Sequence, residues 1–158
     1  ISASAYNNML NLMANADDPT RPIIGFVPAD TRTVSLPFKV NISTTDIGGP
    51  SAGLAFTLAL LDELTSGNLM GTSHVVATGT ISEDGSVGAI GALEQKAVAV
   101  KASGADLFLV PSGQSVDEMK RARHAAGSKV TIVQVATLDE ALAVLRTNGG
   151  DALSATTA

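Results

Sequence analysis

A serine that could act as a nucleophile lies in a glycine-rich turn at the start of an apolar segment. Ser51 follows Gly49 and Pro50 and precedes Ala52 and Gly53. Pro50 suits the first turn of a helix, where free backbone N–H groups and the positive helix end could hold an oxyanion. The same residues also fit an ordinary helix cap, in which Ser51 would have a structural role only.

A serine nucleophile needs a base, and one candidate is a histidine. Segment 49–53 matches the GxSxG pattern of α/β-hydrolases. An esterase of that type would use His124 as base, with Asp106 or Asp117 as its acid. His124 lies among charged residues in a predicted helix, however, which is typical of a solvated side chain. His74 is expected just before a strand.

The other candidate base is a lysine held close to the serine. Burial disfavours an ammonium ion, so a lysine base is expected on an apolar element without a carboxylate partner. Lys96 and Lys101 both lie in segment 93–103, which is expected to be a helix. Lys96 has Leu93 and Val100 at helical spacing, whereas Lys101 is expected to be more exposed. The spacing favours Lys96, and Lys101 stays an alternative.

The composition excludes several other kinds of site. The 158 residues include no cysteine and two histidines, which excludes disulfides, cysteine-ligated metals and a histidine-rich metal centre. The net charge is −5 and aromatic residues make up 3%, so no nucleic-acid partner is expected. No segment approaches the roughly 20 apolar residues of a membrane span. The chain itself is therefore expected to be soluble and without membrane contact, and no cofactor or metal is expected.

Strands and helices alternate along most of the chain. Strands are expected at 23–27, 33–43, 74–81, 86–90, 106–110 and 129–135, with a hairpin turn at 83–85. Helices are expected at 51–64, 93–103, 116–126 and 138–147. The first of these helices is apolar nearly all round, so it is expected to be buried, with Gly67 as its C-terminal cap.

The order of these elements predicts an α+β fold. It would contain a mixed sheet with a β-hairpin, and alternating α/β units in the C-terminal half. Residues 1–22 are expected to be a linker or the remnant of a preceding domain. Residues 23–148 would form one domain, and 149–158 a flexible tail.

Several blocks of sequence are similar to the proteolytic domain of Lon-type serine proteases. They are DIGGPSAGL at 46–54, ATGTI at 77–81, DGSVGAIG at 84–91 and LEQK at 93–96. The strand GADLFLVP at 104–111 also fits. The resemblance is closest to the bacterial branch in which this domain follows a PDZ domain, because glycines precede Pro50 and the nearest acid is Asp46.

The resemblance implies a dyad of Ser51 and Lys96 on the Lon proteolytic fold. Ser51 would attack the peptide carbonyl, and Lys96 would take its proton and return it to the leaving amine. Thr78 would hold Lys96 through a hydrogen bond from its hydroxyl. The amide of Ser51 would serve the oxyanion, within a nucleophile loop that also contains Gly49, Pro50 and Ala52.

The expected function is that of an ATP-independent serine endopeptidase, or the peptidase portion of a larger protease, acting on unfolded polypeptides. No GxxxxGK[ST] motif is present. The family implies a ring-shaped homo-oligomer, and the branch implies a membrane-anchored, extracytoplasmic parent protein. An extended substrate could pair with the expected strand at 33–43. Two alternatives stay open, a non-catalytic assembly domain of the same fold and an esterase that uses His124.

Overall fold

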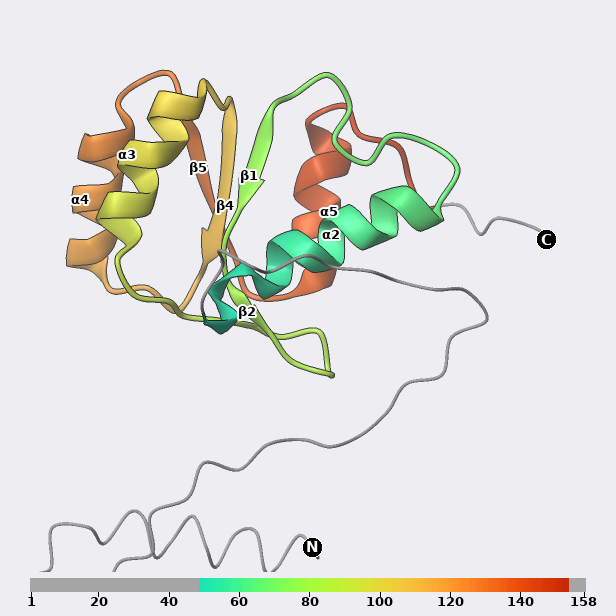
Figure 1. Ribbon diagram of the computed structural model, residues 1–158, viewed down its shortest axis with the longest axis horizontal. Coiled ribbons are helices and arrows are strands. Elements are labelled where there is room, and N and C mark those ends of the chain that lie inside the picture. Colours follow the sequence, from blue (N-terminus) through green and yellow to red (C-terminus); the bar gives the residue numbers. More distant parts are fainter. Residues whose placement is uncertain (1–48, 154–158) are drawn as a thin grey trace, which may run out of the picture. The chain divides into compact units, whose positions relative to one another are not determined.

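A parallel three-stranded sheet forms the centre of residues 49–153, which are the residues that the computed structural model describes (Figure 1). Its strand order is β1 (Val75–Ala77), β4 (Leu107–Pro111), β5 (Thr131–Val135). Leu107 pairs with Val75 on one side and with Thr131 on the other, and both pairings are parallel. Every residue of β4 is buried, as expected for the middle strand of a parallel sheet covered on both faces.

Two pairs of helices cover the two faces of this sheet (Figure 1). Helices α3 (Leu93–Ser103) and α4 (Val116–Ala126) pack on one face, against Phe108 and Val110. Helices α2 (Gly53–Leu64) and α5 (Leu138–Thr147) pack on the other, against Leu107 and Leu109. Successive side chains of β4 therefore enter opposite cores, as the alternation along a strand requires. The α+β class predicted from the sequence is confirmed.

Helix α2 ends at Leu64 as predicted but differs from the prediction in its start, its C-terminal cap and its burial. A short 3-10 helix, η1 (Pro50–Ala52), precedes it. Its C-terminal cap is Thr65 rather than Gly67: the Thr65 backbone is extended, and its amide and hydroxyl both donate to the Leu61 carbonyl, at 3.1 and 2.7 Å. Only Leu54 and Leu58 are fully buried and most other residues of α2 are half-buried, so the helix is less buried than its apolar sequence predicted. These two residues, one turn apart, form the row that faces the sheet.

The expected strand at 74–81 is divided between two sheets. Its first part, β1, joins the parallel sheet. Its last part, β2 (Thr80–Ile81), pairs in antiparallel fashion with β3 (Val87–Gly88), which is the predicted hairpin. Gly79 separates the two parts with a φ of 152°, and a Cβ there would lie 2.6 Å from Val87 Cγ1. The chain can change direction at this point because residue 79 has no side chain.

The last described residues are held against the loop that follows α2. The Gly150 amide donates to the Leu145 carbonyl at 3.0 Å, and the Asp151 amide to the Asn68 carbonyl at 2.9 Å. The chain is thus fixed as far as Asp151, beyond Gly149 where the tail was expected to begin. The expectations for 1–22 and for strands at 23–27 and 33–43 lie outside the described residues. Among residues 49–153, no helix is both long and apolar enough to cross a membrane.

Candidate active site

Ser51 is fixed at the carboxyl end of β1 by main-chain hydrogen bonds. It lies in η1, directly before α2, and its carbonyl accepts a bond of 2.8 Å from the Gly79 amide. The Leu54 amide in turn donates to the Gly79 carbonyl at 3.0 Å. This reciprocal pair ties the start of α2 to the residue that follows Thr78. The close approach is possible because Gly53 has no side chain to meet β2.

Lys96 reaches the same point from the opposite face of the sheet. It is the fourth residue of α3, and the apolar residues Leu93, Ala97 and Val100 anchor this helix in the core. Its Nζ lies 3.2 Å from Ser51 Oγ, to which it donates a hydrogen bond. Both side chains are half-buried. The distance is within the range required between a nucleophile and its base.

The topology explains why these two residues meet. The strands of the sheet run in the same direction, so their carboxyl ends share one edge. Helix α3 returns from that edge to the start of β4, which places its first turn there (Figure 1, the lower end of α3, to the left of β1). Of the two lysines considered from the sequence, Lys96 is in this first turn. Lys101 is in the last turn, at the amino edge.

Thr78 is beside the serine, but its hydroxyl has a different partner from the one expected. It is 4% exposed, and its amide extends the β1–β4 ladder by donating to the Leu109 carbonyl at 3.0 Å. Its Oγ1 donates to the Ser51 carbonyl at 3.0 Å. The Thr78 hydroxyl proton thus bonds to the main chain of the nucleophile, and a contact of this hydroxyl with Lys96 stays a prediction. A carbonyl has two lone pairs, so the Ser51 oxygen accepts from both Thr78 and Gly79.

The residues predicted for the nucleophile loop surround Ser51 in the expected order. Gly49 is the N-cap of η1 with a φ of 81°, a left-handed conformation that favours glycine. Pro50 is the first residue of η1, where its missing N–H costs nothing. Ala52 is the N-cap of α2. The Ser51 amide is at the N-terminal end of a helix, where a donor is favourable for an anion, whereas the first two amides of α2 already donate to carbonyls.

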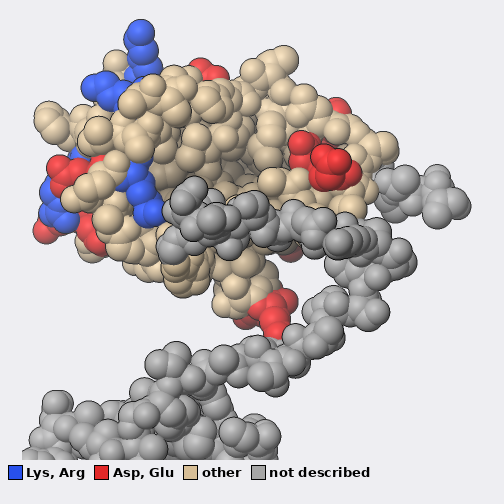
Figure 2. Space-filling model, in the orientation of Figure 1, with Lys and Arg blue, Asp and Glu red and all other residues tan. Residues whose placement is uncertain are grey.

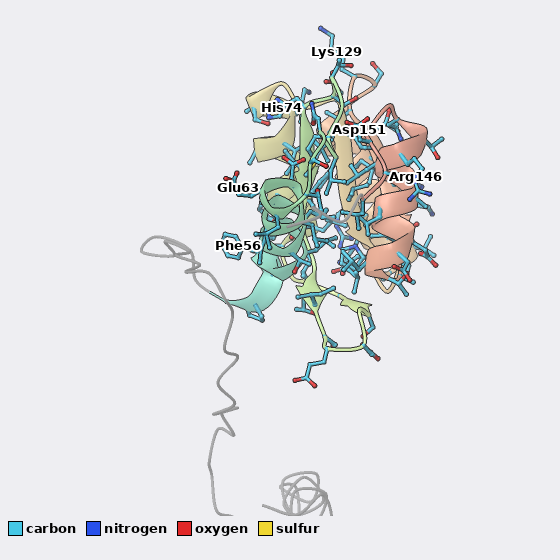
Figure 3. The ribbon with its side chains drawn as sticks, turned by 90° about the vertical axis from the view of Figure 1, so that its right-hand side faces the viewer. Phe56, Glu63, His74, Lys129, Arg146 and Asp151 are labelled. Atoms are coloured by element: carbon cyan, nitrogen blue, oxygen red, sulfur yellow. The ribbon has the colours of Figure 1, made fainter. Side chains whose placement is uncertain are left out.

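The alternative triad based on His124 is not assembled. Helix α4 begins at the carboxyl edge, near Asp117, and returns to the amino edge before β5, so His124 in its last turn lies at the other end of the sheet from Ser51. Asp106 is also at the amino edge, where its carboxylate accepts from the His74 amide at 2.9 Å. Figure 3 shows His74 at the end of the molecule that also carries Lys129. Within the described chain, no group of three or more His, Asp or Glu residues could hold a metal ion.

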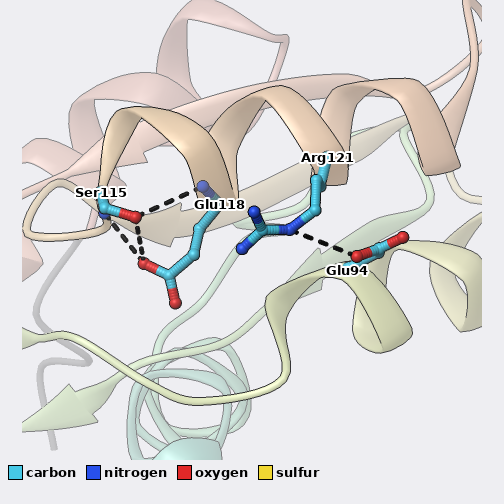
Figure 4. Close-up of polar contacts among 4 residues, drawn as sticks. All are labelled: Glu94, Ser115, Glu118 and Arg121. Atoms are coloured by element: carbon cyan, nitrogen blue, oxygen red, sulfur yellow. Dashed lines mark hydrogen bonds and ion pairs between the residues drawn. The ribbon is translucent and has the colours of Figure 1, made fainter.

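Polar contacts also join α3 to α4 on the outer surface. Arg121 Nε lies 3.4 Å from Glu94 Oε2, in the first turn of α3 (Figure 4). The first turn of α4 is closed by a capping box of Ser115 and Glu118. Figure 2 shows acidic and basic side chains next to one another on the side formed by α3 and α4. The helix that carries Lys96 is thus held by its apolar face and by a surface ion pair.

Gln114, which contacts the segment before α3, was not predicted from the sequence as a residue near the site. The Gln114 side chain, in the loop between β4 and α4, is buried and bonds to the main chain just before α3. The segment Ser112–Ser115 has the composition of a turn, and a neutral amide in a turn gives no sequence signal of such a contact.

The chain is similar to several curated Lon proteases. The chain is 33% identical over 95 residues to the Lon protease of Phenylobacterium zucineum (strain HLK1), which is 60% of this chain and 12% of that protein. It is 29% identical over 118 residues to the Lon protease of Neorickettsia sennetsu (strain ATCC VR-367 / Miyayama), which is 75% of this chain and 14% of that protein. It is 36% identical over 94 residues to the Lon protease of Trichlorobacter lovleyi (strain ATCC BAA-1151 / DSM 17278 / SZ), which is 60% of this chain and 11% of that protein. The matched region thus spans only a small part of each relative.

A family model gives the wider match. The model of the Lon protease (S16) C-terminal proteolytic domain matches residues 35–147, which include Ser51, Thr78 and Lys96. This region is more than half of the chain and contains every described element except the final contacts at 148–153. The chain therefore belongs to the family of Lon protease C-terminal proteolytic domains.

Proposed function

We propose that this chain is an ATP-independent serine endopeptidase, or the peptidase portion of a larger protease, and that Ser51 and Lys96 form its catalytic dyad. The observation that carries the proposal is the 3.2 Å contact between Lys96 Nζ and Ser51 Oγ in a member of a proteolytic-domain family. A hydroxyl is a weak nucleophile, and a base within hydrogen-bond reach is what activates it.

In the proposed mechanism, Ser51 Oγ attacks the carbonyl carbon of the scissile peptide bond while the Lys96 amine, in its unprotonated form, takes the hydroxyl proton. The resulting oxyanion would be stabilised by the amide of Ser51. Pro50 has no N–H, and the Gly53 and Leu54 amides already donate to main-chain carbonyls. The tetrahedral intermediate then collapses, and the amine leaves with the proton that Lys96 returns. Water hydrolyses the acyl-enzyme by the same proton route.

Thr78 supports this arrangement as a positioning residue for the nucleophile. Its hydroxyl and the Gly79 amide both donate to the Ser51 carbonyl, at 3.0 and 2.8 Å. Two bonds to one carbonyl fix the main chain of Ser51 and therefore the direction of its Cα–Cβ bond. Oriented groups account for a large part of enzymatic rate enhancement.

The proposed substrates are unfolded polypeptides, which can enter an active-site turn in extended form. As further proposals that rest on the family resemblance, the parent protein forms a ring of identical subunits. It would also carry a PDZ domain and lie outside the cytoplasm. Sedimentation of the chain over a range of concentrations tests the ring, because a chain that stays monomeric throughout would contradict self-assembly by this domain.

The function is tested by cleavage of a reduced, unfolded test protein without ATP, followed by mass spectrometry of the products. Ser51→Ala and Lys96→Met should each lower the rate by at least about 10²-fold, the usual range for loss of a base. Lys101→Met is the matched control, because it removes an exposed lysine from the same helix. Cleavage that survives Ser51→Ala, or that falls equally in Lys101→Met, would contradict the proposal.

A further inference from the structure

A buried glutamine forms a two-point contact with the main chain immediately before the helix that carries Lys96. The Ile90 amide donates to Gln114 Oε1 at 2.7 Å, and Gln114 Nε2 donates to the Ile90 carbonyl at 3.0 Å. Gln114 is 8% exposed and Ile90 is 9% exposed. The side-chain amide thus satisfies both main-chain groups of Ile90, as a neighbouring strand would. In the mechanism proposed above, neither residue has a role.

This contact lies in the segment between β3 and α3, which is neither a strand nor a helix. Strand β3 ends at Gly88, and α3 begins at Leu93 with no side-chain hydrogen bond at its N-cap. That N-cap, Ala92, has a φ of 58°, and a non-glycine residue in this left-handed region costs of order 1–2 kcal/mol. A strained residue persists only where its surroundings hold it. The Gln114–Ile90 contact, two residues away, is such a constraint.

The strained residue is also connected directly to the lysine. The Lys96 amide donates to the Ala92 carbonyl at 3.1 Å, which is the first hydrogen bond of α3. A change in the path of residues 90–92 would therefore move the first turn of the helix. Lys96 Nζ meets Ser51 Oγ at 3.2 Å, so small displacements would take it out of hydrogen-bond reach.

We propose that Gln114 is a positioning residue of the active site: by pairing with both main-chain groups of Ile90, it holds the first turn of α3 so that Lys96 reaches Ser51. The inference rests on the proposed function, since it assigns Gln114 an effect on activity that passes through Lys96. It differs from a purely structural role, in which Gln114 would only satisfy buried groups and would affect stability throughout the domain.

The test uses two variants of the full chain and one matched control. Gln114→Met removes both hydrogen bonds at nearly constant length. Gln114→Glu is the second variant, because it keeps an acceptor for the Ile90 amide but sets a carboxylate oxygen against the Ile90 carbonyl in place of the donor. The control is Gln134→Met, which removes an exposed glutamine whose Nε2 donates to the Ser112 carbonyl at 3.3 Å in the same loop.

The first measurement, amide hydrogen exchange, does not depend on activity. In Gln114→Met, the amides of Ile90 and Lys96 should exchange at least roughly ten-fold faster, because two buried groups lose their partners. Amides in α5 should keep their rates, and Gln134→Met should match the unmodified chain. Unchanged exchange at Ile90 and Lys96, or equal acceleration in α5, would overturn the inference. If Gln114→Met does not fold, Gln114→Glu provides the same comparison.

The second measurement is the rate at which a fluorophosphonate probe labels Ser51. In the otherwise unmodified chain, Gln114→Met should slow labelling by at least roughly ten-fold. In a chain that already carries Lys96→Met, it should slow labelling by less than about two-fold, because Gln114 acts on Ser51 only through the Lys96 side chain. Unchanged labelling, or an equal loss in both backgrounds, would overturn the inference and leave the dyad standing. Failure of the proposed function is recognised separately. If the proposed function is wrong, the Lys96→Met variant is labelled as fast as the unmodified chain. The inference about Gln114 is then wrong as well, because it depends on Lys96.

Discussion

Lys96 Nζ and Ser51 Oγ are 3.2 Å apart, although the two residues are 45 positions apart in the sequence. They also come from opposite faces of the sheet, since Ser51 directly precedes α2 and Lys96 lies in the first turn of α3. The two side chains meet just beyond the carboxyl end of β1. The contact therefore depends on both helices packing correctly against the sheet, so changes in either core can affect the site.

Loss of the Thr78 hydroxyl should lower activity more than stability. Thr78→Val removes the bond to the Ser51 carbonyl, but Gly79 still satisfies that oxygen, so the unfolding free energy should fall by only about 1 kcal/mol. Labelling of Ser51 should slow by roughly ten-fold or more, because the nucleophile is less well oriented. Thr78→Ser keeps the hydroxyl and serves as the control. Equal labelling of Thr78→Val and the unmodified chain would contradict this role.

A side chain at Gly53 should disturb the contact between α2 and β2. A Cβ there would lie 3.0 Å from Ile81 Cγ2 and 3.1 Å from the Ile81 amide nitrogen. Gly53→Ala should therefore destabilise the domain by about 1–3 kcal/mol of overpacking, set against a gain of up to about 1 kcal/mol in helix propensity. Gly91→Ala is the control, because nothing lies within 4 Å of its Cβ. Urea unfolding that ranks both variants equally would refute the prediction.

The capping box of α4 should make stability depend on pH. The Ser115 hydroxyl and amide both donate to the Glu118 carboxylate, at 2.7 and 3.0 Å, and they lower the pKa of Glu118 below its ordinary value of 4.5 (Figure 4). A carboxyl with a lowered pKa stabilises the folded state above its unfolded pKa. That contribution is lost as the pH falls through the folded pKa.

The measurement is thermal unfolding at about pH 6 and in steps below pH 4.5. Ser115→Ala should lower the melting temperature at the higher pH, and the difference from the unmodified chain should narrow as Glu118 becomes protonated. Ser128→Ala, at an exposed position, is the control. A difference that stays constant across this range would show that the carboxylate does not contribute.

The last described residues should contribute to stability as far as Asp151. Asp151 Oδ2 accepts from the Asn68 amide at 2.8 Å, and the Gly150 amide caps α5 at the Leu145 carbonyl. A chain that ends after Asp151 should unfold at the same temperature as the full chain. A chain that ends after Asn148 should unfold at a lower one. Equal melting temperatures for the two truncations would mean that these contacts stabilise nothing.

Local signals made most of the helices predictable. Helix α3 ends at Gly104 in the left-handed region, and α4 begins with the Ser115–Glu118 capping box. The pairing of Ser51 with Lys96 was predicted from the chemistry a serine requires and from the resemblance to Lon-type domains, and the structure places the two side chains in contact. Helical spacing and the resemblance both favoured Lys96 over Lys101, and the helix orientation gives the physical reason: only the first turn of α3 is at the carboxyl edge.

Tertiary contacts decided what the sequence could not predict. The run from His74 to Ile81 looks like one strand, and its division follows from the φ of Gly79 and its contact with Val87. The hydroxyl of Thr78 could bond to any nearby acceptor, and the Ser51 carbonyl is the one the fold brings there. Gln114 is in a turn-like segment, and its pairing with Ile90 spans 24 positions.

The most direct test of the account is the rate at which a fluorophosphonate probe labels Ser51, compared among the unmodified chain, Lys96→Met and His124→Ala. The labelled peptide is identified by mass spectrometry. If Lys96 activates the serine, labelling should fall at least about 10²-fold in Lys96→Met and stay unchanged in His124→Ala. Undiminished labelling in Lys96→Met would contradict the dyad, and loss in His124→Ala alone would assign the base to histidine.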